Sequence, residues 1–93
     1  MNCFVIMPSD PAFDDVYAAI KAAVERVDHD PPIHCFRLDE YRPAGRITDR
    51  LLTELRRSAI CIADLTGCRP NVMWESGFAM ALNKPLLIAR TLR

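Results

Sequence analysis

The sequence predicts a single α/β domain built on an open, doubly wound parallel sheet. Short apolar runs, such as CFVIMP at residues 3–8 and AICIADL at residues 59–65, alternate with longer segments in which apolar residues recur at helical spacing. These runs are apolar without alternation, which is typical of strands buried on both faces of a parallel sheet. Regular alternation of such strands with helices favours right-handed crossovers and helices on both faces of the sheet.

Four strands and three helices account for most of the chain. We expect strands at residues 3–8, 33–38, 59–65 and 85–89, and the second belongs at a sheet edge because it is less uniformly apolar than the first. We expect helices from a cap at Ser9 or Asp10 to about residue 27, at residues 47–57 and at residues 72–82. The expected strand order is 2-1-3-4, as in flavodoxin-like and Rossmann-like sheets. Because such folds normally add a closing helix, the domain over residues 1–93 is expected to be clipped at its C-terminus.

Composition and charge are those of a small globular domain. The 93 residues are 51% apolar and 26% charged, and twelve Lys and Arg balance twelve Asp and Glu. Nucleic acid is not an expected partner because no run of basic residues is present. The apolar stretches are too short to span a bilayer and the N-terminus does not resemble a signal peptide, so we expect a cytoplasmic protein without a membrane partner.

The cysteines and histidines do not indicate a metal or redox site. The four cysteines form no CxxC pair, and Cys3, Cys35 and Cys61 lie inside apolar runs, which predicts reduced core residues. Neither histidine has the spacing of a zinc ligand, so no metal is expected. The chain also lacks GxGxxG and GxxxxGK[ST] motifs, and we expect no bound cofactor.

The candidate ligand site lies in the segments that follow strands, because open α/β sheets bind ligands beyond the carboxyl ends of their strands. These segments are residues 8–15, 39–46 and 64–76. In the third, Asp64 ends a predicted strand, and Asn71 is placed to cap a helix whose first turn contains Glu75. Only Glu75 and Ser76 are polar in residues 72–82, which predicts a helix buried nearly all round. Glu75 would then be a buried carboxylate, and its free-energy cost calls for a structural or functional explanation.

Structural explanations compete with functional ones at these positions. Glu75 would be favoured near a helix N-terminus by the macrodipole, and Asp64 could simply bond the backbone of its own turn. Gly77 could let the helix approach the sheet closely. The aromatic residues of this helix, Trp74 and Phe78, are more typical of a core than of a base-stacking platform. The arginines after the second strand are more typical of a solvated helix face than of a phosphate site; these are Arg42, Arg46 and Arg50.

Taken together, CFVIMP, FDDVYAAIKAAVE and IADLTGCRPNVMWESGFAMALNKPLLIA resemble the nucleoside 2-deoxyribosyltransferase-like superfamily, particularly its TIR-like, predicted nucleotide-binding branch. The most specific part runs from Ile62 to Ile88, with a strand-ending Asp, Pro-Asn, Glu-x-Gly and Lys-Pro. The resemblance implies that Glu75 is the nucleophile that attacks the anomeric carbon of the sugar. It also implies that Asp64 helps to bind or protonate the departing base.

The resemblance implies cleavage or transfer of the N-glycosidic bond of a nucleoside or nucleotide, which is the expected small-molecule partner. The other candidate substrate-binding residues are Met7, Pro8, Asp39, Gly45, Asn71 and Gly77. A non-catalytic TIR-like module that senses a nucleotide or assembles as a homo-oligomer stays open, as does a TIR-like NAD-cleaving effector. A receiver-like domain with Asp64 as phosphate acceptor is disfavoured because CFVIMPS carries no acid at the end of the first strand.

Overall fold

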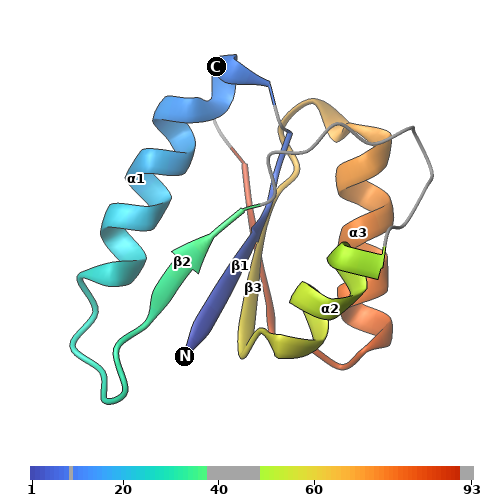
Figure 1. The fold of residues 1–93 in the computed structure, drawn as a ribbon. Coiled ribbons are helices and arrows are strands. Elements are labelled where there is room, and N and C mark those ends of the chain that lie inside the picture. The colour runs from blue at the N-terminus through green and yellow to red at the C-terminus, as the bar shows by residue number, and fades with distance from the viewer. Residues whose placement is uncertain (9, 38–48, 91–93) are drawn as a thin grey trace.

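A computed structural model of the chain describes residues 1–8, 10–37 and 49–90. Its four strands are β1 (Asn2–Ile6), β2 (His34–Phe36), β3 (Ile60–Asp64) and β4 (Leu86–Ala89), all parallel and in the order β2-β1-β3-β4. The helices are α1 (Asp14–Glu25), α2 (Asp49–Arg57) and α3 (Pro70–Ala81), with 3-10 turns at Pro11–Phe13 and Thr66–Cys68 (Figure 1). The predicted fold class and strand order are therefore confirmed. None of the described helices combines the length and apolar content needed to cross a membrane.

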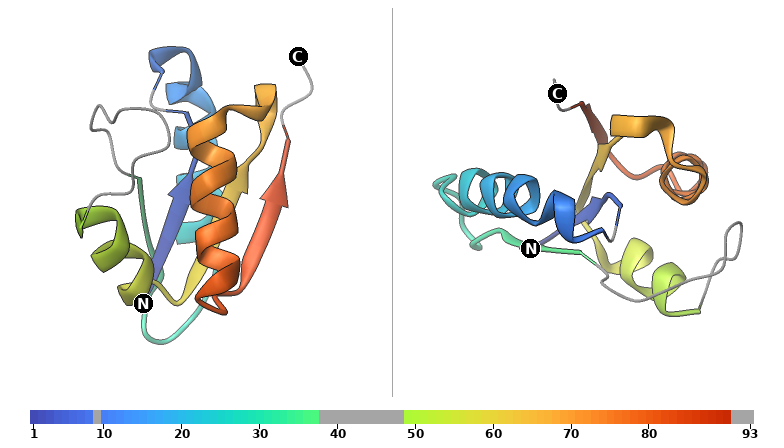
Figure 2. Two further views of the ribbon diagram at one scale, coloured as in Figure 1. Left: turned by 90° about the vertical axis from the view of Figure 1, so that its right-hand side faces the viewer. Right: turned by 90° about the horizontal axis from the view of Figure 1, so that it is seen from above.

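The sheet separates two apolar layers. Helix α1 lies on one face, and α2 and α3 lie on the other (Figure 2). Successive residues of β1 alternate between the layers: Phe4 and Ile6 pack with α2 and α3, whereas Cys3 and Val5 pack on the side of α1. All four side chains are buried, which explains why this strand is apolar at every position rather than at every second one. 

The cysteines occupy the positions that the sequence predicted for them. Cys3, Cys35 and Cys61 are buried on central positions of β1, β2 and β3, whereas Cys68 is exposed, and all are free thiols. Burial raises the pKa of the Cys61 thiol, although Lys84 partly opposes this shift. These three thiols therefore act as small core residues.

The first helix is shorter than predicted. Asp10 does act as a cap, because its Oδ1 accepts a hydrogen bond from the Ala12 N–H at 2.9 Å, but it caps the 3-10 turn that precedes α1. The α-helix then ends at Glu25, so Val27 lies beyond it and is exposed. The next strand is confirmed as an edge strand, although it has three residues instead of six. The predicted start of α2 at Ile47 lies outside the described residues.

The start of α3 differs from the prediction. The helix begins with Pro70 in its first turn and Arg69 at the N-cap, with no side-chain cap bond, so the predicted cap at Asn71 is wrong. Proline suits this position because the first helical N–H groups have no partner within the helix and because its φ is already helical. Glu75 consequently lies in the second turn rather than the first.

The prediction that α3 is buried nearly all round is also wrong. Its inner side is buried, but Met73, Trp74 and Met80 are exposed, and Trp74 is 57% accessible to solvent. Phe78 is partly buried against the core, in line with its predicted role. The difference arises because one sheet face covers only one side of a helix, and none of the described residues covers the other side of α3.

Lys84 joins the end of α3 to the end of α2. Asn83 follows the helix with φ of 58°, a left-handed conformation that Asn tolerates and that turns the chain toward β4. The next side chain, Lys84, donates from Nζ to the carbonyl oxygens of Arg56 (2.8 Å) and Ser58 (2.9 Å). Its cation therefore binds the negative end of α2 at the amino-terminal edge of the sheet.

Replacing Lys84 by Met is expected to lower the free energy of unfolding by about 1–2 kcal/mol, because two carbonyl groups at the end of α2 lose a charged donor. Urea unfolding followed by circular dichroism would measure the change. Arg57→Met is the matched control, because the nearest carboxylate oxygen of Glu54 lies 3.9 Å from Arg57 and such surface pairs contribute little. Equal losses in both variants would contradict a capping role for Lys84.

Candidate functional site

The candidate site lies at the carboxyl-terminal edge of the sheet, beyond Ile6 and Asp64. β1 and β3 are neighbours, and the chain leaves β1 toward β2 on one side and later returns to β3 on the other. This reversal is the topological switch point at which open α/β sheets bind ligands. The described segments that reach this edge are those after β1 and β3, together with the first turns of α3 (Figure 1).

Glu75 lies on the inner side of α3, together with Val72, Ser76 and Ala79. Its side chain is 4% exposed, so the predicted burial of this carboxylate is confirmed. Ser76, the other polar residue of this side, donates from Oγ to the Val72 carbonyl at 2.7 Å and is satisfied within its own helix. Burial of an ionisable carboxylate costs free energy, and such groups concentrate at functional sites.

Asp64 ends β3 and is 1% exposed. Its Oδ1 accepts hydrogen bonds from the backbone N–H of Thr66 at 2.9 Å and from the Thr66 hydroxyl. The turn that it holds contains Gly67 with φ of 77° and Cys68 with φ of 47°. The structural explanation for Asp64 therefore applies: it organises the turn that leads from β3 into α3.

Two arginines that the sequence analysis did not single out also lie at this edge. Arg37 directly follows β2; its guanidinium stacks on the Tyr17 ring with Cζ 4.5 Å from the centroid, and it forms an ion pair with Asp14. Its Nη1 also lies 3.7 Å from the sulfur of Met7, the residue after β1. The Arg37 side chain is mostly buried, which makes it a fixed cation next to the end of β1.

Arg69 repeats this arrangement at the end of β3. Its Nη2 lies 3.4 Å from Oδ2 of Asp10, and its Cζ lies 5.8 Å from the centroid of the Phe13 ring. The pKa of Asp10 is lowered, first by the N–H of Ala12 and then by Arg69, so this carboxylate is ionised at neutral pH. The loops after β1 and β3 are thus joined by a charge pair across the switch point.

A signal for both arginines is present in the sequence. Each is the cation nearest to the carboxyl end of its strand, whereas the other candidate arginines, Arg42, Arg46 and Arg50, are farther along the chain. The predicted strand at residues 33–38 includes Arg37, whereas β2 ends at Phe36, so Arg37 lies at the site edge and not inside the strand. Of the three arginines considered, only Arg50 is described, and it is exposed on α2.

The structure separates the other predicted site residues into three groups. Met7 and Pro8 are buried at the end of β1, and Asn71 is half-buried in the first turn of α3, so these residues lie at the site edge. Gly77 is exposed on the outer side of α3, away from the buried side that carries Glu75. The remaining two, Asp39 and Gly45, lie outside the described residues.

Gly77 does not provide a close approach of α3 to the sheet. Apart from its chain neighbours and the backbone of its own helix, no described atom lies within 4 Å of the place that a Cβ would occupy, so the predicted packing role is wrong. Gly77→Ala is therefore expected to raise the free energy of unfolding by about 0.5–1 kcal/mol, because alanine restricts the unfolded chain and favours the helix.

Urea unfolding of Gly77→Ala would measure this gain. Gly67→Ala is the opposing control: Gly67 has φ of 77°, so alanine there is expected to destabilise the protein by about 1 kcal/mol. A loss of stability in Gly77→Ala would show that the outer side of α3 is packed against something in solution.

No described residues form a metal site, since no three of the described His, Cys, Asp and Glu side chains group in a way that could hold an ion. The charged side chains at the edge include two buried carboxylates, from Glu75 and Asp64, and two arginines that stack on aromatic rings.

No protein-family model matches the chain, and the searches of curated proteins and of solved structures likewise returned no match.

Proposed function

We propose that this domain cleaves or transfers the N-glycosidic bond of a nucleoside or nucleotide, with Glu75 as the nucleophile. A carboxylate oxygen of Glu75 attacks the anomeric carbon, and the electron pair of the breaking C–N bond moves to the base nitrogen. Asp64 assists by donating a proton or a hydrogen bond to the departing base. Water or a second base then attacks the same carbon, which releases Glu75 and completes hydrolysis or transfer.

The observation that carries this proposal is the burial of Glu75 on the inner side of α3, the helix that follows β3 at the topological switch point between β1 and β3. A nucleophilic carboxylate needs a site from which water is excluded and a second group that handles the proton. Asp64, at the end of β3, is the nearest acid in sequence to α3 and is buried as well. The resemblance described above assigns the same two residues.

The direct test is release of free base. The protein would be incubated separately with deoxynucleosides, nucleoside monophosphates and NAD, and the products separated by chromatography. We expect base release from at least one class. With a 2-fluoro-arabinosyl analogue, whose electron-poor sugar slows turnover, we expect a covalent sugar adduct on the peptide that contains Glu75. An adduct on another residue would overturn the assignment of the nucleophile.

A second candidate is a module that binds a nucleotide without turnover. It is favoured by the bonds of Asp64 to Thr66, which give this acid a structural task in the turn before α3. Calorimetric titration with the same three ligand classes separates the two candidates. Binding without free base, unchanged in Glu75→Gln, would favour the binding module, whereas binding accompanied by product favours the enzyme.

Asp64→Asn distinguishes the structural and chemical tasks of this residue. Asparagine keeps an Oδ1 that accepts from Thr66, so we expect the stability to stay close to that of the wild type. Base release is expected to fall by about 10²–10⁴-fold, because the acid that assists the leaving base is lost. Thermal unfolding and the base-release assay would be measured on the same samples, and an unchanged rate would remove Asp64 from the mechanism.

A further inference from the structure

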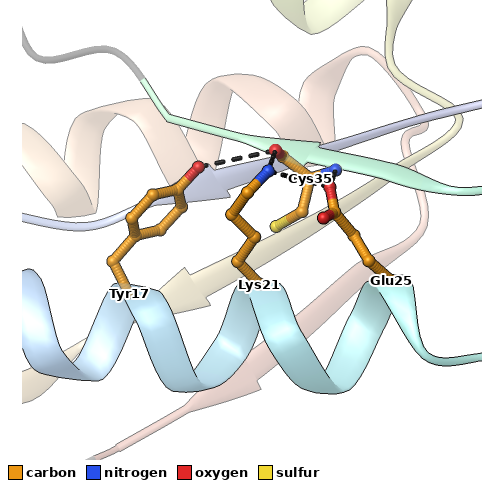
Figure 3. A network of polar contacts seen from close by, with 4 residues as sticks. All are labelled: Tyr17, Lys21, Glu25 and Cys35. Atoms are coloured by element: carbon orange, nitrogen blue, oxygen red, sulfur yellow. Dashed lines mark hydrogen bonds and ion pairs between the residues drawn. The ribbon is translucent and has the colours of Figure 1, made fainter.

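The two edge strands of the sheet differ in whether side chains bond their outward-facing backbone groups. At the β2 edge, the backbone of Cys35 faces away from β1, and side chains of α1 bond it: Glu25 accepts from the Cys35 N–H at 2.8 Å, and Lys21 donates to the Cys35 carbonyl at 2.9 Å (Figure 3). The Tyr17 hydroxyl also lies 3.4 Å from this carbonyl. Edge strands invite pairing with other chains, and these side chains block β2 against it.

The β4 edge has no such protection among the described residues. In the ladder with β3, Cys61 donates to Pro85 and Leu65 donates to Ala89, so every second residue of β4 faces β3. The alternate residues, Leu86 and Ile88, therefore turn their N–H and C=O groups outward. No described group forms a hydrogen bond with them, and Leu86–Ala89 contains no charge or proline that would discourage pairing.

Apolar side chains accompany this open edge on both faces of the sheet. Ile88 is 64% exposed and pairs with Ala63, which places it on the face of α3; Leu87 is 56% exposed and pairs with Ile62, which places it on the opposite face. The exposed side of α3 adds Met73, Trp74 and Met80. Five of the seven large exposed apolar residues in the described chain thus belong to α3 and β4.

We propose that β4 pairs with β4 of a second copy of this chain, antiparallel about a two-fold axis at Ile88. In this register Ile88 faces Ile88 of the other copy, and Leu86 faces Arg90, so that about six backbone hydrogen bonds form. Leu87 lies opposite Ala89 on the face of α1. The four-stranded sheets then continue into one another across the axis.

The charge of the paired segment and the blocked β2 edge both favour a second copy of the chain as the partner of β4. Arg90 is the only charged residue in the paired segment, and its two copies would lie about 13 Å apart along the strands, farther than the screening length of about 8 Å at physiological salt. The chain has no net charge, so long-range repulsion does not oppose association. Because the β2 edge is blocked, the described residues of each copy leave one edge free, and pairing through that edge ends at a dimer instead of a filament.

Sedimentation equilibrium of the full chain over a wide concentration range tests the proposal. We expect a monomer–dimer equilibrium that Ile88→Lys weakens by at least about 100-fold, because two lysines would then face each other at the axis. Val27→Lys is the matched control: Val27 is 53% exposed beyond α1, far in sequence from β4, and its substitution should leave the equilibrium unchanged. Circular dichroism would confirm that both variants are folded.

Amide hydrogen exchange tests the strand pairing itself. We expect the amides of Leu86 and Ile88 to exchange slowly in concentrated wild-type protein and rapidly in dilute protein and in Ile88→Lys. A wild-type chain that stays monomeric at every concentration would overturn the proposal. A dimer that survives Ile88→Lys, or one in which these two amides exchange as fast as free ones, would also overturn it.

Discussion

Replacing Glu75 by Gln is expected to lower the rate of base release by at least about 10³-fold while the domain stays folded. Glutamine matches glutamate in shape, so the buried inner side of α3, which includes Val72 and Ala79, should keep its packing in the core. The amide, however, is neutral and a poor nucleophile, and it cannot form the covalent sugar intermediate. The loss should therefore appear in kcat and in kcat/KM alike.

The measurement is a steady-state assay with the substrate class that the wild-type protein cleaves. Glu54→Gln is the matched control, because it makes the same chemical change on α2, where the carboxylate lies 3.9 Å from Arg57. We expect wild-type rates from this control. Equal base release by Glu75→Gln and the wild type would remove Glu75 from the mechanism and leave only a structural role for its carboxylate.

Replacing Leu55 by Ala is expected to lower the free energy of unfolding by about 2–5 kcal/mol. Leu55 and Leu51 are the two completely buried side chains of α2, and they fill the core between this helix and Phe4 and Ile6 of β1. A helix of nine residues is not stable alone, so α2 depends on these contacts. Truncation leaves a cavity that the rigid sheet cannot close.

Urea unfolding would give the free energy, and the slope of that free energy against urea concentration should stay the same, because the denatured chain is unchanged. In a domain of this size we expect the melting temperature to fall by about 10 °C or more. Leu52→Ala on the same helix is the control: Leu52 is only half-buried, so its loss should be clearly smaller. Similar losses at both positions would contradict the core that we describe.

The prediction of the fold succeeded because it depended on features that are local in sequence. Apolar runs without alternation identified β1 and β3 as buried strands, and the less apolar run around Cys35 identified β2 as an edge strand. Alternation with helical segments then leaves few parallel topologies. Helix ends were less accurate, as the premature end of α1 at Glu25 shows, because competing caps and turns differ by little free energy.

The candidate site was likewise predictable only in its local features. The position of Asp64 at the end of a strand and the burial of Glu75 were predicted from the residues around them, and the structure bears out both. The arrangement of Arg37 on Tyr17 and of Arg69 beside Phe13 was not predicted. Each of these contacts joins segments that are far apart in the chain, so no local pattern contains them.

Periodicity and apolar content act within single elements, so they were enough to predict the α/β class, the strand order and a buried acid that follows β3 in the chain. Which side of each element faces protein depends instead on how the elements assemble. Trp74 and Gly77 were predicted to pack inward and lie on the outside of α3, and Ile88 lies on an open edge. An apolar side chain shows that it avoids water, but only the assembled sheet and helices determine what is available to cover it.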